Sequence, residues 1–336
     1  MAAHFMFLTT IQIVTAYICH CSKILNGLLK FNALPLNRLR IHLQDNRTIV
    51  VEEDKSHGMP AFGMHRGETH MTTGSETISP LFLAHGSPML ALTDIPAQRF
   101  LKELGGKIPA PKGIVVLSPH WETDGQRVSA PGPLKTIHDF YGFPKPLYDI
   151  DYPAEASAEL VGQVMTLLRT AAIDASADTT WGLDHGAWVP LSLLYPKLTV
   201  PVVELSLPHG STPESVHALG RSLAPLAEQG ILLIGSGSTT HNLREIDREG
   251  APAPSWAKSF DDWIDEGLRR GDISRFADLS QAPDFRRVHP TEEHLLPLFF
   301  AMGAAGRDVP AKLLHRSYSH GSISMSYFSF PAAEAA

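Results

Sequence analysis

Three histidines of the sequence each follow an apolar segment of strand length. His85 ends the segment PLFLAH, His120 ends GIVVLSPH, and His241 directly follows ILLIGSGSTT. A single histidine in such a place is usually a capping or surface residue, but three with the same placement indicate a shared site. In open α/β sheets, ligands bind outside the carboxyl ends of the strands, and neutral imidazole is a common ligand of divalent transition metals. The sequence therefore predicts a metal site built from histidines at this edge of a sheet.

Three more histidines are candidates for the same site. His294 stands near the start of EEHLLPLFFAMGAA, an apolar segment with the character of a helix, and His185 lies in the glycine-flanked segment WGLDHGAW. His138 lies in TIHDFYGFP, within a stretch rich in proline and glycine over residues 131–153. Irregular segments of this length are uncommon in compact domains and are often functional lids. We therefore expect residues 131–153 to form a loop over the site.

The composition narrows the choice of metal ligands and partners. The chain has 336 residues, with 17 histidines and only two cysteines, Cys19 and Cys21. Because the rest of the chain has no cysteine, it cannot form disulfides or use thiolate ligands, so a metal there must be held by imidazoles and carboxylates. The formal charge of −7 argues against a broad basic surface for nucleic acid.

Apolar runs and amphipathic segments alternate from Pro80 onward. The amphipathic segments include residues 154–170 and 213–229. The apolar runs are continuous, as is typical of strands buried on both faces. They cover residues 81–84, 113–117, 200–205 and 231–234. This alternation predicts one α/β domain over residues 80–330, with a mainly parallel or mixed central sheet flanked by helices. The metal site is expected at the carboxyl ends of its strands.

The first 79 residues have a different character. Residues 5–18 are apolar over about 14 positions, fewer than the roughly 20 that a membrane-spanning helix needs. A secretory signal has a lysine or arginine before its apolar run, but none precedes these residues. Residues 41–79 show no sustained period of 2 or 3.6. We interpret residues 1–79 as a poorly structured extension, with upstream sequence translated in error as one explanation and an anchor, targeting segment or small subdomain as alternatives. We expect a cytoplasmic protein, with residues 331–336 as a tail.

Six segments of the chain, taken together and in order, resemble one known family. They are LAHGSPML (83–90), GIVVLSPHWET (113–123), TIHDFYGFPKPLYDIDYPA (136–154), WGLDHGAWVPL (181–191), IGSGSTTHNLRE (234–245) and HPTEEHLLPLFFAMGAA (289–305). In these segments the chain is similar to the DOPA 4,5-dioxygenase-like branch of the class III extradiol ring-cleavage dioxygenases, the LigB-like proteins. The resemblance covers residues 80–330. It implies a single α/β domain around a mixed sheet, with a non-haem metal in a cleft at one end.

The resemblance also implies which residues hold the metal. His85 and His120 match the first two ligands, and His294 matches the third, a position where catechol-cleaving relatives carry a carboxylate. Glu292 and Glu293 directly precede His294, so a shift of one residue would restore the common arrangement of two histidines and one carboxylate. Because adjacent side chains on a helix diverge by about 100°, we expect only one of the two candidates to face the metal, and His294 rather than Glu293.

Further roles around the metal follow from the same resemblance. His241 matches the histidine that acts as acid and base, and in zinc-loaded relatives it comes close enough to join the metal ligands. His185 matches a further pocket histidine, which we expect to contact the substrate and to be the second candidate for the base. His138 matches part of the loop over the substrate, and we expect it to contribute to substrate binding.

These expectations together predict an oxidoreductase that inserts O2 into a catechol-type, DOPA-like ring and opens it. One divalent metal is expected per chain. Fe(II) would serve turnover, whereas Zn(II) has no redox chemistry but binds well to the same imidazole-rich site. The expected partners are a small aromatic diol and O2, with no nucleic acid and no membrane. Two alternatives remain: a zinc-dependent hydrolase whose histidines activate water, and a non-catalytic binding module on the same fold.

Overall fold

The computed structural model describes residues 39–44, 48–53 and 77–331. The chain divides into two units, residues 1–71 and 72–336. In the first unit, β1 (Leu39–Gln44) and β2 (Thr48–Glu53) pair as antiparallel strands. The sequence pattern predicted no element there, because residues 41–79 show no sustained period of 2 or 3.6. The apolar run over 5–18, both cysteines and most of the predicted tail lie outside the described residues, and the boundary at residue 79 stays a prediction.

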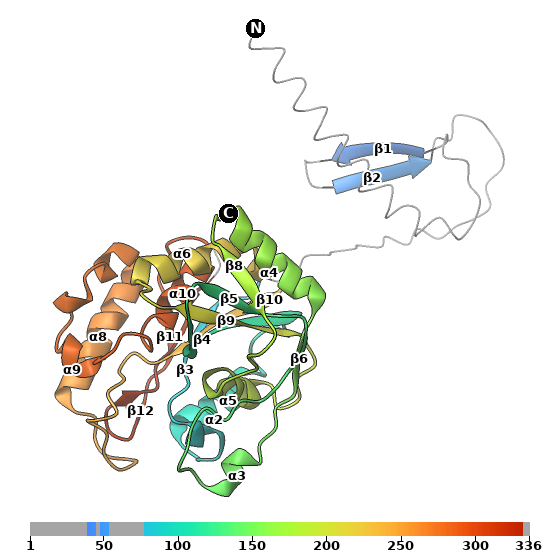
Figure 1. Cartoon of the computed structure of the whole chain (residues 1–336). Helices are drawn as coiled ribbons and strands as arrows, with labels where there is room; N and C mark the ends of the chain where they lie inside the picture. The colour runs from blue at the N-terminus through green and yellow to red at the C-terminus, as the bar shows by residue number, and fades with distance from the viewer. Residues whose placement is uncertain (1–38, 45–47, 54–76, 332–336) are drawn as a thin grey trace. The chain divides into compact units, whose positions relative to one another are not determined.

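An eight-stranded mixed sheet forms the centre of the second unit, in the order β11-β14-β3-β10-β4-β9-β5-β8 (Figure 1). Its strands are β3 (Leu81–Ala84), β4 (Gly113–Thr123), β5 (Gln126–Ser129), β8 (Ala175–Asp178), β9 (Val202–Pro208), β10 (Ile231–Gly237), β11 (Lys312–His315) and β14 (Tyr327–Ser329). The four central strands β3, β10, β4 and β9 are parallel. Strand β14 runs antiparallel to β3. The predicted α/β fold with a mixed central sheet is confirmed.

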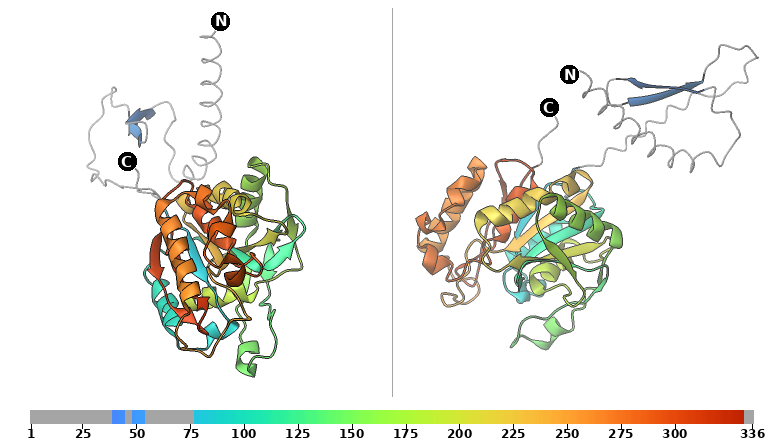
Figure 2. Two further views of the ribbon diagram at one scale, coloured as in Figure 1. Left: turned by 90° about the vertical axis from the view of Figure 1, so that its left-hand side faces the viewer. Right: turned by 45° about the horizontal axis from the view of Figure 1, so that its top comes forward.

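Helices cover both faces of this sheet (Figures 1 and 2). They are α2 (Pro96–Leu104), α3 (Lys145–Tyr148), α4 (Ala158–Thr170), α5 (His185–Leu194), α6 (Pro213–Leu223), α7 (Pro225–Glu228), α8 (Ser255–Arg270), α9 (Phe285–Val288) and α10 (Pro297–Ala304). Neighbouring residues of β10 show which helix covers which face, because successive side chains of a strand point to opposite sides. A side chain at Gly235 would collide with the backbone of Pro297 in α10. The hydroxyl of Ser236 donates a hydrogen bond to the carbonyl of Gly186 in α5.

Some elements differ from the expected boundaries. Strand β4 runs on to Thr123 with an irregular register after Leu117, so His120 lies inside the strand and not at its end. The amphipathic segment 213–229 is divided into α6 and α7 at Pro225, because proline lacks the N–H that a continuous helix needs. The expected helix over 154–170 begins only at Ala158, where Ser157 caps it. Short strand pairs complete the fold: β6 (Gly132–Leu134) with β7 (Ala154–Ala156), and β12 (Tyr318–Ser319) with β13 (Ile323–Ser324).

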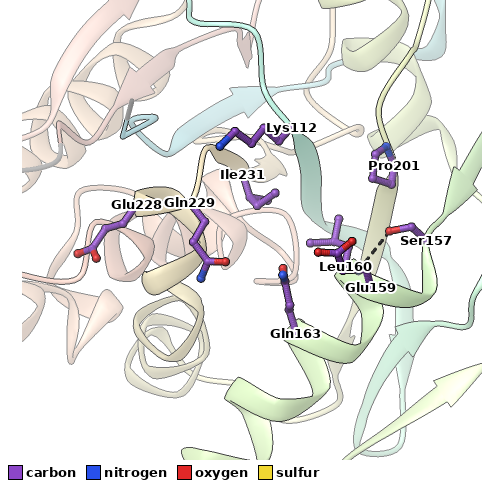
Figure 3. A pocket seen from close by; sticks show the side chains of 9 residues that line it. All are labelled: Lys112, Ser157, Glu159, Leu160, Gln163, Pro201, Glu228, Gln229 and Ile231. Atoms are coloured by element: carbon purple, nitrogen blue, oxygen red, sulfur yellow. Dashed lines mark hydrogen bonds between the residues drawn. The ribbon is translucent and has the colours of Figure 1, made fainter. Parts of the chain in front are cut away.

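A cavity of about 460 Å³ lies at the amino ends of the parallel strands (Figure 3). It is lined by Lys112 and Ile231 at the starts of β4 and β10, and by Glu159 and Gln163 from α4. His85 and His241 follow the opposite, carboxyl ends of β3 and β10. No histidine lines this cavity, so it is not the predicted metal site.

No helix among the described residues combines the length and apolar character needed to cross a membrane. The cytoplasmic location stays a prediction.

We expect residues 1–70 to be dispensable for the fold of the second unit, because the two units separate at Met71. A chain that begins at Met71 should unfold in one cooperative thermal transition. Its midpoint temperature should equal that of the second unit in the full chain. Thermal unfolding followed by circular dichroism measures this. Aggregation of the shortened chain under conditions where the full chain stays in solution would show that the first unit is structurally required.

Candidate metal centre

Five histidine rings gather where β3, β4 and β10 end. The His120 ring centroid lies 4.9 Å from that of His85, 4.0 Å from that of His185 and 5.0 Å from that of His294. The His241 ring stacks on the His294 ring with centroids 3.5 Å apart and an interplanar angle of 9°. The structure therefore brings together all of the histidines that the sequence singled out except His138.

Each of the five histidines stands at a different element of the fold. His85 directly follows β3, and His241 comes four residues after the last residue of β10. His120 sits in β4 where its register with β9 is irregular. His185 is the first residue of α5, whose N-cap is Asp184. His294 lies in the turn that precedes α10. A parallel sheet brings these distant residues to one edge because its strands all end there.

Hydrogen bonds at the Nδ1 atoms orient two of the rings. Nδ1 of His85 lies 3.0 Å from the hydroxyl oxygen of Ser236. That hydroxyl already donates to the carbonyl of Gly186, so it accepts from His85, whose Nε2 is left with a free lone pair. Nδ1 of His294 donates to Oε1 of Glu293 at 2.9 Å. Carboxylates and hydroxyls bonded to one ring nitrogen are the usual partners of histidines that bind metals through the other nitrogen.

The free nitrogen atoms are placed as metal ligands would be. The Nε2 atoms of His85 and His120 are 3.1 Å apart. Two nitrogens that each bind a metal at about 2.0–2.1 Å stand about 2.9–3.4 Å from each other. Nε2 of His294 is buried and has no hydrogen-bond partner among the described residues. An imidazole-rich set with carboxylates nearby suits Zn(II) and Fe(II), so the residues present fit a bound metal.

Two sets of possible ligands have donor atoms within 4.8 Å of one another. The first contains His85, His120 and His185, and the second contains His241, Glu293 and His294. The expected third ligand, His294, thus belongs to the second set, while His185 accompanies the two expected first ligands.

The expectation that Glu293 and His294 both lie on a helix is wrong. Residues 293–296 form a turn, and α10 begins only at Pro297. In this turn the Glu293 carboxylate bonds the His294 ring. Glu293 therefore lies at the site together with His294, and the expectation that His294 rather than Glu293 faces the metal stays a prediction.

Burial lowers the pKa of four histidines of the site, which keeps these four rings uncharged at neutral pH. It lowers the pKa of His120 to about 4, with a further contribution from the nearby His185. It also lowers the pKa of His241 to about 4, although the negative charge of Glu293 acts in the opposite direction. The pKa of His85 and of His294 is lowered well below the ordinary value by burial and the neighbouring rings. A metal therefore has no proton to displace from these rings at pH 7.

We expect the metal-free protein to lose stability as the pH falls from 6.5 toward 4. His120, His241 and the buried His289 have a pKa of about 4 in the folded protein, but about 6.5 in the unfolded chain. The unfolded state therefore binds more protons in this window, so the free energy of unfolding decreases with falling pH. Between pH 6.5 and pH 5 the loss should be about 1–2 kcal/mol for each histidine. Urea unfolding of the metal-free protein at several pH values measures it, and a flat profile contradicts it.

His138 lies in the loop and not in the histidine cluster. Its Nε2 donates to the carbonyl of Ile150 at 3.0 Å, and its ring packs near Phe140, Tyr148 and Trp188. The hydrogen bond to Ile150 joins the two ends of the loop over residues 131–153. The substrate contact expected for His138 stays a prediction.

Asp139 and Ser236 were missed in the sequence. Asp139 fastens the loop to the cluster, because its carboxylate accepts hydrogen bonds from Nδ1 of His185 at 2.8 Å and from the His185 backbone N–H at 2.9 Å. Burial acts to raise the pKa of Asp139, but the hydrogen bonds and charge of His185 bring it below the ordinary value. Its position next to His138 was the available signal. For Ser236, the signal was its place on the strand that leads to His241.

Comparisons with known proteins identify the chain. Residues 80–331 match the family model described as the catalytic LigB subunit of aromatic ring-opening dioxygenase. The chain belongs to this family. Its LigB domain is similar to a protein named 4,5-DOPA dioxygenase extradiol from Beta vulgaris, with 39% identity over 74% of this chain and 95% of the relative. A protein of the same name from Escherichia coli K12 is 38% identical over 75% of this chain and 94% of the relative.

A solved structure supports the same assignment. The crystal structure of an uncharacterized protein from Escherichia coli K12 superposes with a TM-score of 0.64 and 33% identity, covering 76% of this chain and all of that chain. This LigB-family chain is thus an extradiol ring-opening dioxygenase of the DOPA-dioxygenase-like branch, an oxidoreductase, and the family is metal-dependent. The hydrolase and binding-module alternatives are set aside.

Proposed function

We propose that this dioxygenase opens the ring of a small DOPA-like catechol with Fe(II) held by His85, His120 and His294. The observation that carries the proposal is the pair of Nε2 atoms of His85 and His120 at 3.1 Å, beside the buried, unpartnered Nε2 of His294. The printed names of the Beta vulgaris and Escherichia coli relatives support a substrate with the ring of DOPA.

His294 is a better third ligand than His185 because its buried Nε2 has no hydrogen-bond partner among the described residues. A buried polar atom without a partner costs about 1–3 kcal/mol, and such atoms in folded proteins call for an explanation, such as an ion. Nε2 of His294 is in this position. His185 is instead fastened through both its ring and its backbone to Asp139 of the loop, a placement that suits a group facing the substrate.

Bound Fe(II) would supply the redox chemistry, holding catecholate and O2 together and passing electrons between them. The chain's own part begins with His241, whose uncharged imidazole accepts a proton from a catechol hydroxyl and later returns it. Stacking on His294 keeps that imidazole beside the proposed ligands. Phe140 lies against the His185 ring with centroids 5.8 Å apart and gives the loop an apolar surface that excludes water from the site.

Oxygen uptake tests the proposal. Protein loaded with Fe(II) under anaerobic conditions should consume one O2 for each catechol when air is admitted, with a coloured ring-opened product. DOPA and unsubstituted catechol serve as the two substrates. Protein loaded with Zn(II) is the matched control and should consume none, because zinc has no redox chemistry. The proposal fails if the Fe(II) form consumes no oxygen with either diol, or if the Zn(II) form is equally active.

A further inference from the structure

Residues 238–241, the His241 segment, are held on both sides by hydrogen bonds. On one side, the N–H of Ser238 donates to the carbonyl of His294 at 2.8 Å, and the N–H of His241 donates to the carbonyl of Val288 at 3.2 Å. On the other side, the hydroxyl of Thr240 donates to the carbonyl of Ser322 at 2.6 Å. The segment has no regular secondary structure, so these bonds, and not a ladder or helix, fix its path.

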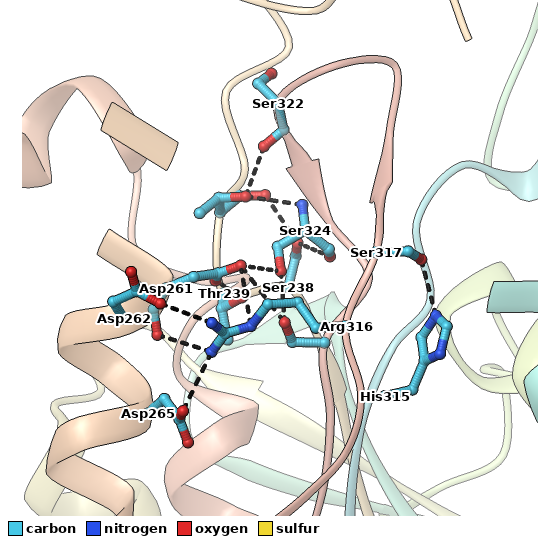
Figure 4. A network of polar contacts seen from close by, with 12 residues as sticks. Ser238, Thr239, Asp261, Asp262, Asp265, His315, Arg316, Ser317, Ser322 and Ser324 are labelled. Carbon is cyan, nitrogen blue, oxygen red and sulfur yellow. Dashed lines mark hydrogen bonds and ion pairs between the residues drawn. The ribbon is translucent and has the colours of Figure 1, made fainter. Parts of the chain in front are cut away.

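A buried carboxylate on α8 lies against the same segment (Figure 4). Asp261 is 1% exposed. Its Oδ1 accepts a hydrogen bond from the hydroxyl of Thr239 at 2.5 Å, and its Oδ2 accepts one from the hydroxyl of Ser324 at 2.7 Å. Arg316 approaches Oδ2 to 4.0 Å and also pairs with Asp262 at 2.7 Å. Asp261 thus joins α8, the His241 segment and the strand β13.

Thr239 is the point where this network meets the site. Its hydroxyl is bound by Asp261, and its carbonyl accepts a hydrogen bond from Nε2 of the fully buried His289 at 2.8 Å. The hydroxyl and the carbonyl of Thr239, two positions before His241, are therefore both held by hydrogen bonds. A buried charged group is expensive, and apolar residues of similar volume often stabilise a fold as well or better. The carboxylate instead orients its neighbours, because the hydroxyls that donate to it must take defined positions.

We propose that Asp261 is a positioning residue that, through the hydroxyl of Thr239, holds the His241 ring in its stacked place on His294. The inference rests on the role of His241 in the proposed function. A displacement of about 1 Å in a catalytic group can lower a rate about 100-fold. A loosened Thr239 should therefore reduce turnover while the protein stays folded and the metal stays bound.

Three threonine variants test the contact in the Fe(II)-loaded enzyme. Thr239→Val keeps the shape and removes the hydroxyl, and we expect kcat to fall about 10- to 100-fold with KM and iron content little changed. Thr239→Ser keeps the hydroxyl and should restore most of kcat. Thr212→Val removes the hydroxyl that caps α6, in a helix that contributes no residue to the site. It should keep kcat. An unchanged kcat in Thr239→Val, or equal losses in all three variants, overturns the proposal.

A second measurement does not depend on turnover. In metal-free protein with labelled histidines, the ring signal of His241 can be assigned from its absence in His241→Gln. Thr239→Val and Asp261→Asn should shift, broaden or double that signal, whereas Thr239→Ser and Thr212→Val should leave it in place. An unmoved signal in Thr239→Val overturns the positioning role. If the wild-type enzyme opens no catechol ring but the signal responds as expected, the proposed function fails and the positioning of His241 stands.

Discussion

Replacement of His85 or His120 by alanine is expected to remove most of the bound metal. Each substitution deletes one of the two Nε2 atoms that lie 3.1 Å apart. Loss of a group that merely supports a ligand weakens metal binding about 10- to 100-fold, so loss of a ligand itself should weaken it by more than about 100-fold. Metal analysis after dialysis against a buffer with a weak chelator measures the change. Thermal stability should drop mainly in metal-containing buffer, because a ligand that binds only the folded state stabilises it.

His209→Ala is the matched control for both variants. The His209 side chain is 58% exposed and is 3.7 Å from Glu122, outside the histidine cluster, so its removal should leave the metal content unchanged. If His85→Ala and His120→Ala both retain a full equivalent of metal, the proposed centre is wrong. If all three variants lose metal equally, the loss reflects a general loss of folding and not of ligands.

The convergence of the histidines was predictable because it depends on local patterns. Continuous apolar runs predict strands buried on both faces, and His85, His120 and His241 follow such runs. Strands of a parallel sheet end at one edge, so three strand-end histidines had to come close if the sheet formed. This reasoning did not need the exact strand limits, because the rings come together although β4 continues past His120 to Thr123.

The partners of these histidines were not predictable in the same way. His85 bonds Ser236 across 151 residues of sequence, and His185 bonds Asp139 across 46. Such pairs come from the tertiary fold and leave no periodic pattern. The expected start of the helix near His294 differs for another reason. Pro297 occupies the first position of α10, the place in a helix that proline favours, so Glu293 and His294 precede the helix.

His241→Ala should separate metal binding from chemistry. His241 stacks on His294, yet the proposed ligands His85, His120 and His294 do not include it. The Fe(II)-loaded variant should therefore keep most of its iron and still bind a catechol. Loss of a general acid and base typically lowers a rate about 10²- to 10⁴-fold, and kcat should fall into this range. Substrate binding should shift to higher pH, because the catechol must lose its proton without the help of an imidazole.

The contrast with His294→Ala makes this prediction sharp. His294 carries the buried, unpartnered Nε2, so its removal should empty the site, whereas removal of His241 should leave it filled. Iron content and single-turnover oxygen uptake, measured side by side for the two variants, distinguish the roles. If His241→Ala loses the iron and His294→Ala keeps it, the two roles are exchanged and His241 is the third ligand. If both variants keep the iron, Glu293 is the natural third ligand, because its carboxylate lies in the same turn and already reaches the cluster. Two histidines and one carboxylate would then hold the metal, the common arrangement for non-haem Fe(II).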